Sequence, residues 1–78
     1  MHLVVGDRVE YEFSATEPVD FNIHYHEGNA VVAPIGREKV YADSGVFVAL
    51  IAQHYCLMWE AGVAGAMLDY RVRPRAPP

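Results

Sequence analysis

The sequence has a single cysteine, Cys56, and only six basic side chains against ten acidic ones. One cysteine cannot close an intramolecular disulfide, so no disulfide framework supports the fold. With a formal net charge of −4, the chain lacks the basic excess that nucleic acids and anionic membrane surfaces attract. We therefore expect neither nucleic acid nor a membrane as a partner.

A long hydrophobic run is also missing. The most apolar stretch, residues 46–58, is interrupted by Gln53 and His54 and is shorter than the ~20 residues a spanning helix needs. No signal peptide is expected, because the charged pair Asp7-Arg8 lies close to the start. We expect a soluble chain. Its compartment stays open, since a leader removed from a longer precursor is the alternative to a cytoplasmic protein.

What the chain does have is alternation of apolar and polar residues. Val9, Tyr11 and Phe13 alternate with charged residues, and residues 19–25 repeat the pattern. Such a period of two predicts strands with one face in a core and one in water. Pro18 is expected to separate the two strands, because proline cannot donate to a ladder.

Further strands are expected at residues 30–33, 46–52, 54–59 and 66–73. Breaks or turns are expected at residues 27–29, 34–36, 43–45 and 60–65, which are rich in Gly, Pro, Asp and Asn. Residues 37–42 fit either an edge strand or a loop. Residues 46–52 are apolar throughout, as in a strand covered on both sides, although a helix would also suit part of them.

Six to eight short strands at roughly ten-residue spacing predict an all-β chain, a small antiparallel β-sandwich with GOLD-like or immunoglobulin-like topology. The expected organisation is one domain over residues 1–73, followed by a Pro-rich C-terminal tail over residues 74–78.

The order of these segments resembles the GOLD (Golgi dynamics) domain, a small β-sandwich of early-secretory cargo receptors and some lipid-binding proteins. The matching segments are Val9-Glu10-Tyr11-Glu12-Phe13, Pro18-Val19-Asp20-Phe21-Asn22-Ile23, Gly45-Val46-Phe47, residues 55–59 and Leu68-Asp69-Tyr70-Arg71-Val72. The chain differs in having Glu60-Ala61 where the family often has an asparagine, and in lacking the transmembrane and coiled-coil segments of the cargo receptors. The resemblance implies a soluble, stand-alone β-sandwich with a binding role.

Residues 54–59 have two chemically different faces when read as a strand. One face carries Tyr55, Leu57 and Trp59, and the other carries His54, Cys56 and Met58. The first set suits a core. The second is a row of soft, metal-competent donors, and His24 and His26 add two imidazoles on the polar face of an earlier strand.

If these two strands are neighbours, their donors would meet, because opposed side chains in a sheet have β-carbons ~4.5–5.5 Å apart. The sequence then predicts a metal site for copper first and zinc second, built from His24, His26, His54, Cys56 and Met58. His24 and His54 would be the anchors, Cys56 the thiolate and Met58 a weak fourth donor, with His26 able to replace His24 if the register shifts.

The alternative is that these residues are ordinary surface and filler side chains of a protein–protein interaction domain without metal. Free sandwich edges and an exposed row of Tyr41, Met58 and Met67 would then support a homodimer or another protein partner. An exposed Cys56 could also cross-link two chains in an oxidising compartment. We do not expect an enzyme, because a Cys–His pair on one strand offers neither an oxyanion hole nor a pocket.

Overall fold

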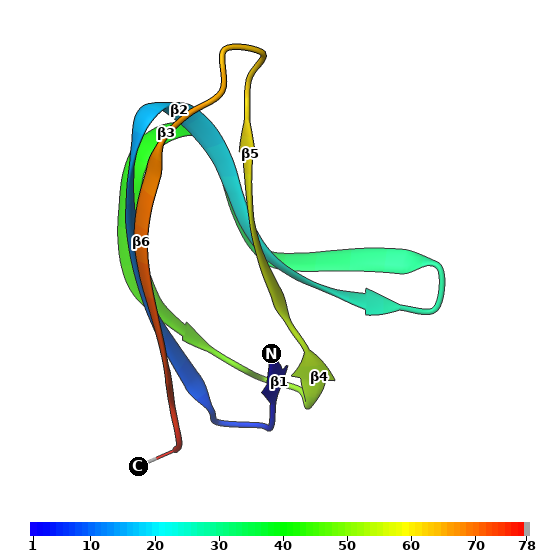
Figure 1. Cartoon of the computed structure of the whole chain (residues 1–78). Coiled ribbons are helices and arrows are strands. Elements are labelled where there is room, and N and C mark those ends of the chain that lie inside the picture. Colours follow the sequence, from blue (N-terminus) through cyan, green and yellow to red (C-terminus); the bar gives the residue numbers. More distant parts are fainter. Residues whose placement is uncertain (78) are drawn as a thin grey trace.

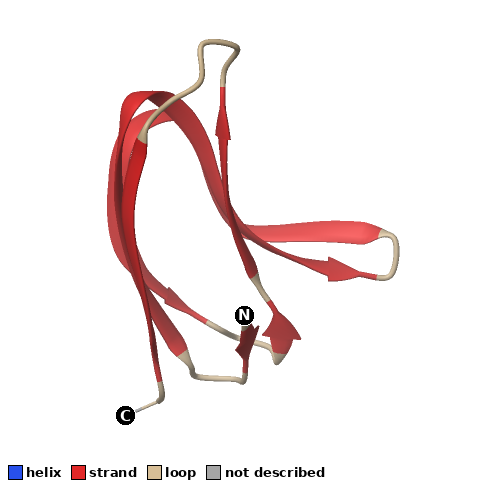
Figure 2. Cartoon of the chain, in the orientation of Figure 1, coloured by secondary structure: helices blue, strands red, loops and turns tan. Residues whose placement is uncertain are grey.

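The computed structural model describes residues 1–77, which form six strands and no helix (Figure 2). The strands are β1 (His2–Leu3), β2 (Arg8–Glu27), β3 (Ala30–Val48), β4 (Gln53–His54), β5 (Cys56–Ala61) and β6 (Leu68–Arg75). All their pairings are antiparallel. The predicted small antiparallel β-sandwich is therefore confirmed. Over residues 1–77 no helical segment is available to cross a membrane.

The long strand β2 organises the sheet. One of its edges pairs with β3 from Arg8 to Glu27, through a hairpin whose two-residue turn begins at Gly28. Gly28 has φ +60°, as the first central residue of a type II′ turn requires. The other edge of β2 pairs with β6 along residues 8–15 and with β5 along residues 19–24. Since β2 and β3 both bend, each contributes to both layers of the sandwich (Figure 1).

The bend lies where a strand break was expected at Pro18, and that expectation is wrong because β2 continues through it. The β2–β3 register shifts between Ser14 and Val19, and within the described chain no ladder partner faces Pro18. The missing N–H of proline therefore costs no ladder hydrogen bond. On β3, Lys39 takes φ +50°, and its backbone N–H donates to Asp20 Oδ1 at 2.9 Å.

Several other boundaries also differ from the sequence pattern. Strand β3 runs without interruption through residues 34–36 and 43–45 and ends at Val48, so residues 49–52 lie outside it. Residues 46–48 are not covered on both faces, since Val46 and Val48 are 57% and 44% exposed while Phe47 is buried. The reason is that only one face of β3 packs against the core, and the other face meets solvent.

The last strands show smaller differences. The predicted strand over residues 54–59 is interrupted at Tyr55, which separates β4 from β5. Strand β6 begins at Leu68 and continues to Arg75, two residues past the predicted end at Arg73. Residues 66 and 67 precede it, and Pro78 of the predicted tail lies outside the described residues.

The core lies between the two layers, and half of its buried residues are aromatic. The Phe21 ring contacts Tyr11, Phe13 and Trp59 at ring-centroid separations of 5.1, 4.8 and 5.3 Å. Tyr70 of β6 covers Trp59 from the other layer, with the ring centroids 5.1 Å apart. The inward rows predicted from the alternation in β2 are buried: Val9, Tyr11, Phe13, Val19, Phe21 and Ile23.

Candidate functional site

The strands that carry the predicted metal donors are neighbours. Antiparallel pairing of β2 with β5 sets His24 opposite Cys56 and Asn22 opposite Met58. Directly opposed residues of an antiparallel pair lie on the same face of the sheet. The face shared by His24, Cys56 and Met58 is the outer one, because the alternate residues, such as Ile23, are buried in the core.

The inner face of this strand pair is the predicted core face. Tyr55 is fully buried, and Leu57 and Trp59 are half-buried and pack against the core. The Tyr55 hydroxyl donates to the Ile51 carbonyl at 2.8 Å. Burial raises the pKa of Tyr55 above its usual value, because removal from water penalises the phenolate. Both faces of the strand therefore have the orientation that the sequence indicated.

The two histidines of β2 lie side by side on the outer face. Their ring centroids are 5.3 Å apart, with the ring planes nearly perpendicular. His24 Nδ1 is 2.6 Å from Asn22 Oδ1. With Asn22 Oδ1 as the acceptor, Nδ1 of His24 is the donor in this bond, and a neutral ring then carries its lone pair on Nε2. Asn22 therefore orients the His24 ring, a contact that sequence reasoning missed.

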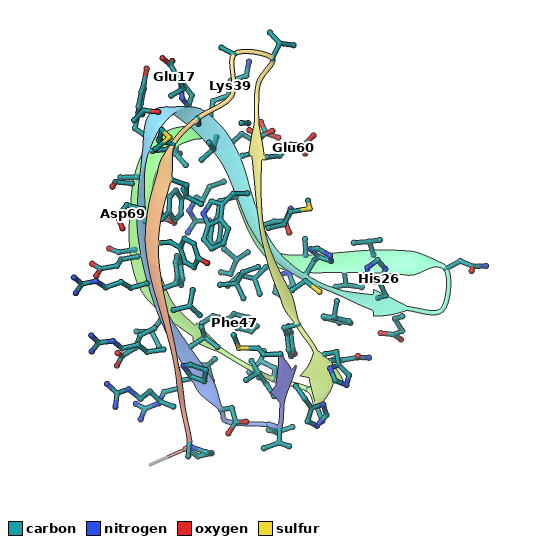
Figure 3. The ribbon with its side chains drawn as sticks, viewed as in Figure 1. Glu17, His26, Lys39, Phe47, Glu60 and Asp69 are labelled. Atoms are coloured by element: carbon teal, nitrogen blue, oxygen red, sulfur yellow. The ribbon has the colours of Figure 1, made fainter. Side chains whose placement is uncertain are left out.

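His26 stands further out, on the projecting arm where the end of β2 pairs with the start of β3 (Figure 3). Cys56 is a free, exposed cysteine, and Met58 is 41% exposed. Neither sulfur is covered by core packing. The thiol and the thioether are therefore accessible on the same outer face as His24.

His54 has a different neighbour. Continuing the β2–β5 register by two residues would set His26 opposite His54, but this ladder ends at His24 and Cys56. His54 belongs to β4, which pairs with β1 and faces His2. The two rings have centroids 4.9 Å apart. The structure thus divides the predicted donors into one group on β2 and β5 and a separate pair that includes His2.

His2 was not singled out in the sequence. Its strand, β1, is two residues long, which is too short to show a period. Its position is fixed by contacts with residues far along the chain, among them the Tyr55 N–H, which donates to the Met1 carbonyl at 2.7 Å. The only signal available in the sequence was a histidine beside the apolar run that starts at Leu3.

Within residues 1–77, no three His, Cys, Asp or Glu side chains converge as a preformed metal cluster would. In the outer-face group, strand register places Cys56 opposite His24, and His26 lies beside His24 on the same strand. The two imidazoles are already close, and joining the sulfur donors to them in one metal site would require side-chain rotation on exposed strands. The energetic cost of such rotation is small, because staggered rotamers of exposed side chains exchange readily.

Comparison of the chain with protein-family models, with curated proteins and with solved structures found no match. The resemblance to the GOLD domain therefore stays a prediction. Function is inferred from the fold and from the positions of the donor residues.

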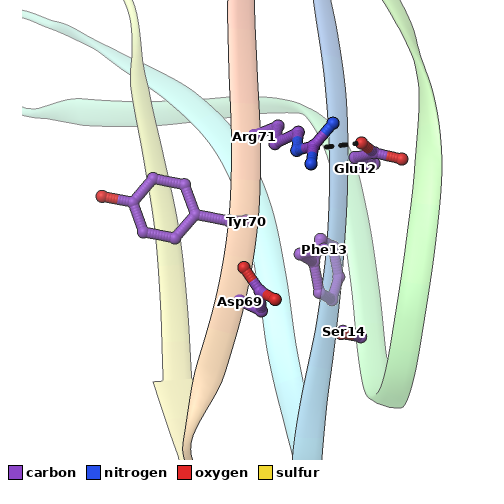
Figure 4. A pocket seen from close by; sticks show the side chains of 6 residues that line it. All are labelled: Glu12, Phe13, Ser14, Asp69, Tyr70 and Arg71. Carbon is purple, nitrogen blue, oxygen red and sulfur yellow. Dashed lines mark ion pairs between the residues drawn. The ribbon is translucent and has the colours of Figure 1, made fainter.

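A second surface feature lies on the opposite layer, where β2 and β6 pair. A shallow hollow there is lined by Glu12, Phe13, Ser14, Asp69, Tyr70 and Arg71 (Figure 4). Arg71 Nε lies 3.8 Å from Glu12 Oε1, and Arg75 forms a similar pair with Glu10 at 3.6 Å. These groups are exposed, so their charges are screened by water. They form a row of solvated ion pairs along the sheet.

Proposed function

We propose that this domain binds a soft metal ion, Cu(I) before Zn(II), on the outer face of β2 and β5. The ligands are His24, His26, Cys56 and Met58, a set of imidazole, thiolate and thioether donors that suits Cu(I). The role is binding and not catalysis. The β2–β5 register carries this proposal, because it brings Cys56 opposite His24 and sets Met58 two residues along the same face.

The separation of the two imidazoles supports the proposal. A metal lies ~2.0–2.1 Å from an imidazole nitrogen and therefore about 3.2 Å from the ring centroid. Two imidazoles at trigonal or tetrahedral angles then have centroids about 5.2 to 5.5 Å apart. The centroids of His24 and His26 are 5.3 Å apart. Asn22, bonded to His24 Nδ1, is the outer partner that metal-ligating histidines usually have.

The test is thermal unfolding of the reduced protein with and without Cu(I). A ligand present at 100 times its Kd and bound only to the folded state stabilises it by ~2.7 kcal/mol. For a domain of this size that corresponds to a rise in Tm on the order of 10–20 °C. The shift should be lost in a His24→Ala, Cys56→Ser double variant. Met58→Leu should reduce the shift, because it removes the thioether donor. Met67→Leu is its matched control, because Met67 is also exposed but lies outside β5.

Identical melting curves for the native chain with and without Cu(I) and Zn(II) would refute the metal proposal. A double variant that retained the full shift would refute the choice of ligands. Asn22→Ala provides a finer test. It should weaken metal binding about 10-fold or more and leave the Tm of the metal-free protein nearly unchanged, because its effect passes through the His24 tautomer.

A second candidate function, a protein-interaction domain, is favoured by the free edge of β3. Within the described chain that edge is unpaired over 19 residues, and exposed Tyr41, Val46 and Val48 lie along it. Unprotected edges accept further strands, including those of a second copy. Light scattering across a range of concentrations distinguishes the two functions. A metal-independent dimer would favour the interaction domain, and a monomer at every concentration would argue against a homodimer.

A further inference from the structure

His2 and His54 form a pair of imidazoles where the N-terminal strand β1 meets β4. They are cross-strand partners in the β1–β4 ladder, and both are exposed. Their ring centroids are 4.9 Å apart and their planes are inclined by 56°. Core packing does not explain this arrangement, since neither ring belongs to the buried cluster of the described residues.

We infer that His2 and His54 form a second metal site, for a borderline divalent cation such as Cu(II), Ni(II) or Zn(II). Imidazole is a preferred ligand of all three ions. With each metal–centroid distance about 3.2 Å, two imidazoles at N–metal–N angles of about 90–109° have centroids about 4.5 to 5.2 Å apart. The observed 4.9 Å lies in the middle of that range.

The site has two protein ligands, and water completes the coordination shell. Among residues 1–77, no third His, Cys, Asp or Glu joins the pair. The absence of a thiolate distinguishes this site from the proposed soft-metal site. Its preference is for Cu(II) above Ni(II) and Zn(II), as the general affinity order for nitrogen ligands dictates. This inference does not depend on the proposed function.

A metal bound by both histidines would clamp β1 onto β4. Strand β1 is short, and it is otherwise held by the buried side chain of Leu3 and by backbone hydrogen bonds, including the Tyr55 N–H to the Met1 carbonyl. Because β1 pairs with β4 and not with the other described strands, its release would expose Leu3 and the Tyr55 amide while leaving the β2–β3–β5 ladder intact. The metal therefore controls local opening of the N-terminal strand.

The location is tested by NMR titration of Cu(II) into the full chain carrying Cys56→Ser, which removes the thiol that Cu(II) would oxidise. Paramagnetic broadening should appear first at the amides of His2, Leu3, Gln53 and His54. His2→Ala and His54→Ala should each weaken binding at least 10-fold, whereas the control Val63→Ala, at an exposed turn position outside both donor groups, should leave binding unchanged. Both residues are exposed, so the substitutions leave the core intact.

Three outcomes would overturn the inference. Broadening centred on His24 and His26 would assign the ion to the other group. Undiminished Cu(II) binding in His54→Ala would assign it to a chelate of His2 with the terminal amine. The third outcome concerns the clamp, which hydrogen exchange of the Tyr55 amide tests in the unmodified chain. Zn(II) at 100 times its Kd should slow this exchange about 100-fold. An unchanged exchange rate would refute the clamp.

Discussion

Gly45→Ala is the substitution whose effect follows most directly from the packing. Gly45 lies in β3 opposite Tyr11 of β2. A β-carbon at Gly45 would lie 2.9 Å from Tyr11 Oη and 3.2 Å from Cζ. The ring has little room to move away, since Tyr11 is 6% exposed and its hydroxyl donates to Asp43 Oδ2 at 3.3 Å. Glycine is therefore needed at position 45 for close approach and not for an unusual backbone angle.

Two effects of opposite sign set the size of the change. Overpacking costs about 1–3 kcal/mol. The smaller conformational freedom of alanine in the unfolded chain returns about 0.4–1 kcal/mol. We therefore expect Gly45→Ala to lower the free energy of unfolding by about 0.5–2 kcal/mol.

Gly36→Ala is the matched control, because Gly36 lies in the same strand and an added β-carbon there meets no atom within 4 Å. This variant should be stabilised by up to about 1 kcal/mol. Urea unfolding followed by Trp59 fluorescence measures both variants. In a Tyr11→Phe background the cost of Gly45→Ala should shrink, because the closest atom is removed. Equal stability of the two glycine variants would refute the packing argument.

Three further predictions concern the core and the surface charges. Phe21→Ala should cost about 3–5 kcal/mol and leave much of the protein unfolded at 25 °C, whereas Val63→Ala, at a fully exposed loop position, should be neutral in the same urea assay. Burial, followed by the nearby Asp43 carboxylate, raises the pKa of Tyr11 above its usual value of 10.0. The unfolded chain then loses this proton at a lower pH than the folded chain does. The contribution of Tyr11 to the free energy of unfolding should therefore be fully present below about pH 10 and should be lost as the pH rises further. Tyr11→Phe should make that alkaline decline shallower, and an unchanged slope in pH-dependent urea titrations would contradict the assignment. Glu12→Gln should change stability by less than about 0.5 kcal/mol, because the pair with Arg71 is exposed and 3.8 Å long; a larger loss by thermal unfolding would show that the pair is not screened.

The boundaries of the strands show where sequence reasoning stops. Pro18 did not end β2, and residues 34–36 and 43–45 did not end β3. Whether proline or glycine breaks a strand depends on whether a neighbouring strand requires an N–H or a side chain at that position. That information belongs to the partner strand, and at Pro18 the ladder happens to be open.

The candidate site was predictable in part. The alternation in residues 54–59 indicated that Cys56 and Met58 face outward, and they do. Their adjacency to His24 was a condition that the sequence could state but not decide. The separation of His54 from this group, and its pairing with His2, result from the end of the β2–β5 ladder and the start of the β1–β4 ladder.

The alternation along residues 8–14, 19–25 and 54–59 was enough to predict the all-β class and the core-facing side chains of these segments, because the direction of a side chain in a strand depends on the local period of two. It was not enough for residues 46–52, where no alternation is present and the expected two-sided burial is absent. Which outward donors meet depends on strand pairing, and the sequence does not contain that information. A register shifted by one residue would exchange the faces of a whole strand, and register is set by bulges and by packing between segments distant in sequence. Cys56 gains His24 as a neighbour for that reason, and His54 gains His2.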